Sequence, residues 1–263
     1  MLPLFAQATP TTIPEFTEAL TCGLQQHGVT PRRIEGQGAA FPDFDLLRVD
    51  LTESQMTREL RPPPVSATTG DVVGIAHFEL LGAPLYFEKA PLELHLIAEG
   101  VKARLTMNDG RGCLVPESAA AGNVSVQIAR AALEALLHSI AVEVAAKQGF
   151  EVRKTRLSLT QDGPLAVSFR AEVTAKVFVM SAMLALTGRL MIDDELNARI
   201  SGLALGGDGM ILKLAGGYAR PYLDRWEGRV FPLLAFTFGG LKLRNVELTA
   251  GDNVLVRAQF ASA

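Results

Sequence analysis

Side chains that could bind a cation or carry out acid–base chemistry are few and scattered in this chain. The longest acidic run is Asp193, Asp194 and Glu195, and clustered carboxylates bind metal ions when their oxygens converge. Neighbouring side chains on an extended backbone point in opposite directions, so three consecutive acids cannot all reach one ion. The run lies between two stretches in which apolar and polar residues alternate. We therefore predict that it forms the solvated tip of a β-hairpin, and that a cation site there needs ligands from elsewhere.

The histidines do not form a metal-binding motif. None is spaced HxxxH; they are His27, His77, His95 and His138. His77 and His95 fall on two expected strands, where they could approach each other with Glu79 or Glu93, but ordinary half-exposed strand histidines explain the same pattern. His138 is expected on the flank of a helix. We predict no metal site and no cofactor.

Motifs of nucleophilic catalysis and of nucleotide binding are also missing. The sequence has no GxSxG, no GxGxxG after a strand and no GxxxxGK[ST]. Asp43 and Asp45 follow or flank Pro42 and are typical of a turn that leads into a strand. Cys22 and Cys113 are far apart and are expected as two reduced thiols. The prediction is a protein without catalytic residues, and hence not an enzyme.

One segment combines aromatic and basic residues, "GGYARPYLDRWEGR". Its candidate patch consists of Tyr218, Arg220, Tyr222, Arg225 and Trp226. One interpretation is a membrane patch with the aromatics at headgroup level and arginine on phosphate. The other is a helix packed by its aromatic residues with the arginines directed outward. Both interpretations stay open on the sequence alone.

Composition limits the class of protein. The chain has 263 residues, 48% hydrophobic and 20% charged, with a net charge of −3, which predicts a single folded domain over 1–263 with a sizeable core. Lysine and arginine are scattered and aromatics are only 6%, so we expect no nucleic-acid partner. No signal peptide and no run of about 18 apolar residues is evident. A cytoplasmic location is expected, with peripheral membrane contact as an addition to it.

The first half of the chain is predicted to alternate between helix and strand. Residues 12–27, within an N-terminal lead-in of 1–30, have Pro14 for a first turn and Gly28 for a stop. The expected strands are 44–53, 72–81, 85–97 and 100–107, with a Pro-rich loop at 61–70 and a hairpin turn at Asp109–Gly110. Residues 123–147 predict an amphipathic helix capped by Asn123, about 25 residues and roughly 37 Å long.

The second half contains unusually long alternating segments. Residues 164–179 place apolar side chains at every second position, and the alternation continues to Ile192 with a change of parity near Met180–Ser181 that suggests a bulge or bend. A further strand follows the acids. A second helix is expected over 208–226, kinked near Gly216–Gly217 and Pro221. Two strands joined by residues 250–253 end the chain.

This order of elements, with "LALTGRLMIDDELNARISGLAL" and the closing "PLLAFTFGGLKLRNVELTAGDNVLVRAQF", resembles the DUF2993 family. That family includes LmeA-like bacterial proteins and is grouped with the tubular lipid-binding (TULIP) superfamily. The resemblance covers about residues 30–260 and rests on hydrophobic pattern and glycine placement. It implies an α+β fold in which a strongly curved antiparallel sheet of long strands wraps around a long amphipathic helix and leaves an apolar groove for acyl chains. The chain differs from LmeA-like members in having no evident signal peptide or lipobox.

The functional hypothesis is binding, and transfer as an extension of it, of a lipid or another hydrophobic ligand in an elongated apolar groove. The expected lining combines the helix with the alternating strands: Leu133, Leu137, Ile140, Val167, Phe169, Val173, Leu184, Leu186 and Ile200. An acyl chain gains about 0.8 kcal/mol for each CH₂ that it buries. The alternative is a structural or protein-interaction module whose core is filled by its own side chains and whose partner patch lies near Trp226.

Overall fold

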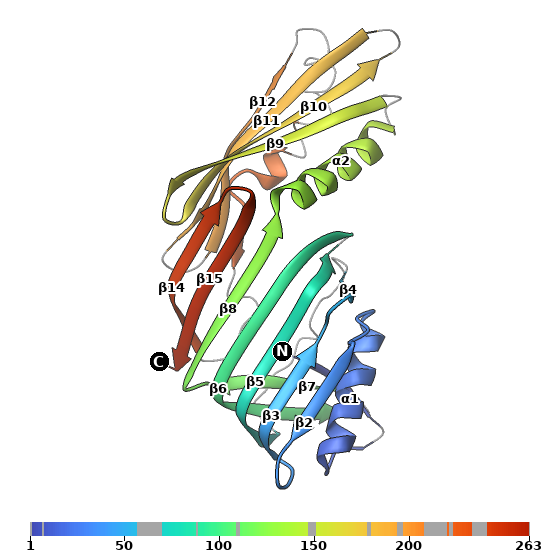
Figure 1. Cartoon of the computed structure of the whole chain (residues 1–263), viewed down its shortest axis with the longest axis vertical. Coiled ribbons are helices and arrows are strands. Elements are labelled where there is room, and N and C mark those ends of the chain that lie inside the picture. Colours follow the sequence, from blue (N-terminus) through green and yellow to red (C-terminus); the bar gives the residue numbers. More distant parts are fainter. Residues whose placement is uncertain are drawn as a thin grey trace. The chain divides into compact units, whose positions relative to one another are not determined.

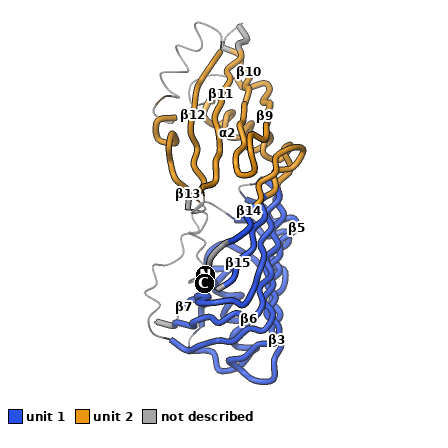
Figure 2. The backbone as a smooth tube through the Cα atoms, turned by 90° about the vertical axis from the view of Figure 1, so that its left-hand side faces the viewer, with its two compact units in different colours: residues 1–127, 236–246, 256–263 blue, residues 128–235, 247–255 orange. Residues whose placement is uncertain are grey.

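The structure, a computed structural model, describes residues 2–6, 8–56, 70–87, 89–108, 111–146, 151–177, 180–193, 197–207, 220, 223–232 and 241–262. Over these residues the chain is α+β and built mostly of strands (Figure 1). It divides into two compact units: unit 1 comprises residues 1–127, 236–246 and 256–263, and unit 2 comprises residues 128–235 and 247–255 (Figure 2). Three strands contribute residues to both units, and the single domain over 1–263 stays a prediction.

The larger sheet is mixed. Its main path runs β14-β15-β8-β6-β5-β3-β2, with β7 on β6, β1 on β7 and β4 on β5. Strands β3 and β4 are parallel to β5, whereas β2–β3, β5–β6, β6–β7 and β1–β7 are antiparallel. The strands are β1 (Leu2–Phe5), β2 (Arg33–Gln37), β3 (Asp43–Asp50), β4 (Gln55–Met56), β5 (Asp71–Phe87), β6 (Ala90–Asn108), β7 (Arg111–Ser118), β8 (Ala121–Ala129), β14 (Leu241–Ala250) and β15 (Asn253–Ser262).

Helix α1 (Ile13–Gln26) forms where local signals predicted it. Thr12 and Glu15 make a capping box, Pro14 lies in the first turn, and Gly28 takes the left-handed conformation, φ +75°, just beyond the end. The helix buries one apolar face against strands β1 and β2 and the sheet beyond them. Phe16 and Leu20 of the helix, with Leu47 and Val49 of β3, are completely buried. Unit 1 therefore has a closed hydrophobic core.

The predicted strand boundaries at 81–85 and 97–100 are wrong, because β5 and β6 each continue through the expected break. The register of β5 with β6 shifts between Gly82 and Leu85, so a bulge absorbs the "GAP" segment that looked like a strand end. Gly100 lies within β6 with φ +59°, a conformation that glycine adopts without strain. Antiparallel pairing of Asn108 with Arg111 confirms the hairpin; its tip, Asp109–Gly110, lies outside the described residues.

The smaller sheet belongs to unit 2 and has the order β13-β12-β11-β10-β9, with every neighbouring pair antiparallel. Its strands are β9 (Glu151–Gly163), β10 (Ala166–Val177), β11 (Met180–Ile192), β12 (Asn197–Gly207) and β13 (Val230–Pro232). The apolar–polar alternation changes phase near Met180 because the chain reverses there, and Val177 pairs directly with Met180. The predicted bulge within a continuing strand is therefore wrong.

The hairpin predicted around the acidic run is confirmed. Ile192 pairs with Ala198, and the Asp193 and Asn197 backbones are hydrogen-bonded at 3.0 Å. The Asp193 carboxylate accepts hydrogen bonds from the Asn197 backbone and side-chain amides, at 2.8 and 3.2 Å. Asp194 and Glu195 lie outside the described residues. Asp193 therefore acts as a turn residue, its short acidic side chain binding the backbone of Asn197 across the turn.

Helix α2 (Arg130–Ala146) is shorter than predicted, since residues 121–129 form strand β8. Val124 and Ile128 fit a helical stripe, but together with Val126 they also fit a strand alternation, and β-branched residues favour the strand when partner strands are present. Seventeen residues give a helix of about 25 Å. The cap at Asn123 is wrong, and a sheet that curves strongly around a long helix stays a prediction.

Several predictions fall outside the described residues: the Pro-rich loop at 61–69, and residues 208–219 and 221–222 of the second helix with its kink. Arg220 and residues 223–226 are helical, as predicted. The two closing strands, joined through Gly251 and Asp252, are confirmed. Among the described helices none combines the length and the hydropathy needed to span a bilayer.

Candidate functional site

Antiparallel register places all six predicted lining residues of the strands on one face of the smaller sheet. Directly paired residues share a face: Val173 of β10 is opposite Leu184 of β11, and Val167 is opposite Leu190, which in turn is opposite Ile200 of β12. We call this surface the apolar face. It comprises Leu157 and Leu159 of β9; Val167, Phe169, Ala171 and Val173 of β10; Leu184, Leu186, Gly188 and Leu190 of β11; and Ile200 and Leu205 of β12.

The apolar face is less deeply buried than the core of unit 1. Leu157, Val167 and Ala171 are buried, but eight of its larger side chains are only half-buried: Leu159, Phe169, Val173, Leu184, Leu186, Leu190, Ile200 and Leu205. In unit 1, by comparison, Leu47 and Val49 of β3 and Val73 of β5 are fully buried. Aliphatic side chains that keep part of their surface in water retain an unused hydrophobic driving force. The surface therefore has the chemistry to bind an aliphatic ligand.

Glycines shape this face at two positions. A Cβ at Gly188 would lie 2.5 Å from Cζ of Phe169, so the aromatic ring packs directly over the glycine. The register between β11 and β12 shifts near Gly202, whose φ is +65°. There the Glu227 carboxylate accepts hydrogen bonds from the amides of Gly202 and Leu203, at 2.9 and 2.7 Å. This bulge aims Leu203 toward Gly188, since Leu203 Cδ2 lies 2.8 Å from the same Cβ position.

Helix α2 lies along β9, the edge strand of the smaller sheet (Figure 1), and is attached to it by polar side chains. Glu134 Oε2 accepts the Leu157 amide at 2.7 Å, and Arg130 Nη1 donates to the Leu157 carbonyl at 3.3 Å. His138 Nδ1 and Thr155 Oγ1 lie 3.1 Å apart. Glu134 and Arg130, one turn apart, thus bond to the backbone of the edge strand as a neighbouring strand would, and His138, one turn further, contacts a side chain of the same strand.

The apolar residues of α2 are not deeply enclosed. No residue of Arg130–Ala146 is buried. Leu133 and Leu137 are half-buried and Ile140 is 37% exposed. With Glu134 and His138 directed at β9, Leu137 lies close to the contact row, whereas Leu133 and Ile140 fall about a quarter to a third of a turn away. The predicted helix residues therefore adjoin the sheet through β9, and their joint role in a groove stays a prediction.

The opposite face of the smaller sheet is strongly basic, which the sequence interpretation missed. The polar positions of β9 to β12 place Lys154, Arg156, Arg170, Lys176, Arg189 and Arg199 on it. Its acids among the described residues are Glu151, Asp162 and Glu172, which pair with Arg153, Arg189 and Arg170. We call this surface the basic face. The cations come from four strands and never form a run, so only the register reveals that they share a face.

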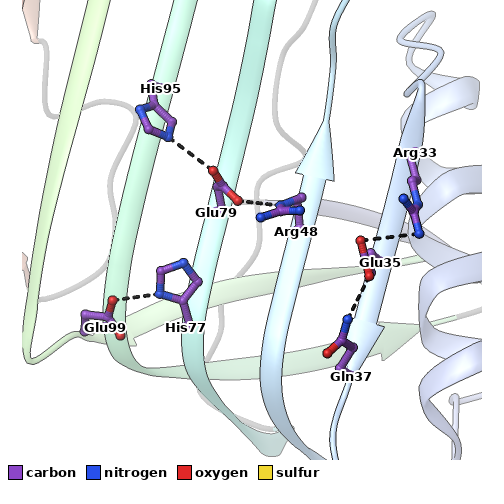
Figure 3. A network of polar contacts seen from close by, with 8 residues as sticks. All are labelled: Arg33, Glu35, Gln37, Arg48, His77, Glu79, His95 and Glu99. Carbon is purple, nitrogen blue, oxygen red and sulfur yellow. Dashed lines mark hydrogen bonds and ion pairs between the residues drawn. The ribbon is translucent and has the colours of Figure 1, made fainter.

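Unit 1 carries a ladder of polar contacts on the outer side of β2, β3, β5 and β6 (Figure 3). Arg48 Nε donates to Glu79 at 2.5 Å, and His95 Nε2 lies 3.3 Å from the other oxygen of Glu79. His77 Nδ1 lies 2.7 Å from Glu99. Each histidine thus has its own carboxylate. Among the described residues no group of three or more His, Cys, Asp or Glu side chains is close enough together to hold a metal ion.

Glu79 is the ionisable centre of this ladder. Burial alone would raise the pKa of its carboxyl, but hydrogen bonds and charge from Arg48 and His95 outweigh burial and lower the pKa below its ordinary value. The same hydrogen bond from Arg48 to Glu79 raises the pKa of the guanidinium. A carboxylate held in its charged form between two partners is suited to tying strands together. It is poorly suited to taking up a proton near neutral pH.

The aromatic-basic segment is described only in part. Tyr218 and Tyr222 lie outside the described residues, while Arg220, Arg225 and Trp226 are exposed. The Arg229 guanidinium lies over the Trp226 ring, 5.1 Å from its centroid, a distance typical of a cation–π contact. Among the described residues of this segment, the ring of Trp226 is therefore stacked on a cation of its own chain. Its role as a membrane or partner patch stays a prediction.

Comparisons with known proteins give no relative for this chain. No family model matches it, no curated protein matches it significantly, and no solved structure matches it significantly. The resemblance to the DUF2993 family therefore stays a prediction, and any functional conclusion depends on the two faces of the smaller sheet.

Proposed function

We propose that the protein is a non-enzymatic binder of lipid, which holds an acyl chain against the apolar face of the smaller sheet. The observation that carries the proposal is the register itself. Six predicted lining residues, Val167, Phe169, Val173, Leu184, Leu186 and Ile200, share one face, and five of them are only half-buried.

The chemistry of the face favours an unbranched aliphatic ligand. Its described side chains along β10 and β11 are aliphatic apart from Phe169, and offer no hydrogen-bonding group to orient a polar ligand. A strand of 12 residues spans about 40 Å, which suits an elongated chain better than a compact one. Burial of about ten CH₂ groups contributes roughly 8 kcal/mol before the cost of ordering the ligand.

Two adjacent residues on β11 provide a matched test. Leu184 is half-buried on the apolar face and Met183 is exposed on the basic face. Leu184→Gln places an amide where the ligand must lie, and is expected to weaken binding of a fluorescent fatty acid about 5- to 30-fold. Met183→Gln makes the same amide on the other face and should leave that affinity unchanged.

The ligand itself is identified by organic extraction of the purified protein followed by mass spectrometry. Recovery of acyl chains from wild type, in smaller amount from Leu184→Gln, supports the proposal. Equal loss of binding in both variants, or a protein with no extractable lipid and no affinity for the fatty acid, contradicts it. The second outcome favours the alternative of a protein-interaction module. That alternative is tested by whether Trp226→Ala abolishes capture of a partner.

A further inference from the structure

We infer that the basic face of the smaller sheet binds an anionic lipid bilayer. The inference does not depend on the acyl-binding proposal, because it concerns the other side of the same strands. It rests on how charge and exposed apolar side chains are arranged row by row, where a row is a set of residues directly opposite one another on neighbouring strands.

Each of six successive described rows of the basic face contains one cation. They run from Arg199, in the row of Ala166, through Arg189, Arg170, Arg156 and Lys154 to Lys176. Lys154, Arg156 and Arg199 are exposed and form no ion pair with the described residues. The chain as a whole carries a net charge of −3, so this face is a local departure from an acidic average. Unpaired cations on an exposed surface attract anionic lipids.

Exposed apolar side chains stand among these cations. Met191 and Val230, 38% and 42% exposed, share a row with Arg199, and Met183, 41% exposed, shares a row with Lys154. The two rows are eight residues apart on β10, about 26 Å. Isolated apolar side chains beside cations fit a bilayer, because the apolar groups enter the acyl boundary while lysine and arginine stay at phosphate level.

A bilayer fits this face better than a nucleic acid does. The described residues of the basic face include no tyrosine, tryptophan or phenylalanine on which a base could stack. Methionine and valine gain nothing from a phosphate backbone, whereas they gain from an acyl boundary. The two classes of partner are separable by experiment.

The test compares the full chain on vesicles of phosphatidylcholine alone with vesicles that also contain phosphatidylserine, by flotation. Wild type should float with the anionic vesicles and detach as salt is raised. The variant K154E/R156E/R199E should lose at least about 100-fold in partitioning, roughly fivefold for each cation. The matched control K102E/R244E/R257E changes exposed cations of unit 1 by the same total charge and should float like wild type.

A double variant isolates the contribution of the exposed apolar side chains to bilayer binding. Met183→Gln with Met191→Gln should weaken flotation severalfold without changing its dependence on salt, because no charge is altered. Circular dichroism and thermal unfolding check that each variant is folded. The inference is overturned by equal binding to neutral and anionic vesicles, by equal effects of the two triple variants, by no flotation, or by tighter binding to short RNA or DNA duplexes than to vesicles.

Discussion

The attachment of α2 to the edge of the smaller sheet gives the sharpest structural prediction. Leu157 is buried, yet its amide belongs to an edge strand and finds its acceptor in the Glu134 carboxylate at 2.7 Å. In Glu134→Ala the amide loses this acceptor. A buried amide without a partner costs about 1–3 kcal/mol, with the upper part of the range applying where the lost acceptor is charged.

We therefore expect Glu134→Ala to lower the free energy of unfolding by about 2 kcal/mol and to speed hydrogen exchange of the Leu157 amide by roughly 10- to 100-fold. Urea unfolding gives the first quantity and NMR-detected exchange gives the second. Glu134→Gln keeps a carbonyl acceptor in the same place and should recover most of the protection. Ser139→Ala, at an exposed position of the same helix, controls for helix propensity.

The reasoning is refuted by a Leu157 amide that exchanges at the wild-type rate in Glu134→Ala while stability is unchanged. That outcome would mean that apolar contacts hold α2 in place without the polar row. It would also mean that the polar contacts of α2 with β9, which include those of Arg130 and His138, contribute little to stability.

Two further predictions concern unit 1. Gly23→Ala should lower the free energy of unfolding by about 1–3 kcal/mol, although alanine normally favours a helix, because the new Cβ would lie 2.3 Å from the Pro3 carbonyl oxygen of β1. Thermal unfolding measures the effect, and Gly163→Ala, whose new Cβ would have nothing within 4 Å, is the control. Arg48→Met should lower the free energy of unfolding only at pH values where Glu79 is ionised. Because the folded protein lowers the pKa of Glu79, the ion pair stabilises the fold fully above the unfolded-state pKa of Glu79, and this stabilisation is lost as the pH falls through the folded-state pKa. Melting curves from about pH 3 to pH 7 should therefore converge at the acid end, and a constant difference would contradict the assignment.

The part of the fold that sequence predicted best is α1, whose signals are all local. Thr12, Pro14, Glu15 and Gly28 act within a few residues of the helix ends, so no distant contact was needed to place them. The hairpin at Asp193 was predictable for the same reason: alternation on both sides of a polar turn fixes which strands are neighbours.

Elements that depend on distant strands were predicted less well. Residues 121–129 joined the helix in the sequence interpretation because Val124 and Ile128 are four apart, yet β6 and β15 lie on either side of this segment and pair with it. The breaks expected at Gly82 and Gly100 were absorbed as irregularities inside long strands. Propensity identifies where a strand is weak, whereas the partner strand decides whether it continues.

The apolar face of the smaller sheet could be predicted from the sequence more readily than the basic face. The apolar face follows from a period of two along β10 and β11, which any alternating sequence displays. The basic face required the register, because Arg156, Arg170, Arg189 and Arg199 lie on four different strands. The signal available in the sequence is that arginine or lysine recurs at the polar positions of these strands, which is weaker than a continuous basic run.

Both proposals assign opposite faces of one sheet to lipid, which restricts how they can act together. A sheet is impermeable to a chain crossing it, because its backbone is joined by continuous hydrogen bonds. An acyl chain that leaves a bilayer bound at the basic face must therefore pass around an edge or beyond the strand ends to reach Leu184 and Leu186. At β9 that route meets the side chains of Arg130 and Glu134 and the Gln161 amide, which bonds to the backbone of Leu248 and Ala250 in β14. The described contacts thus close this edge to an acyl chain, and ligand entry has to use another side of the sheet or the opening of α2.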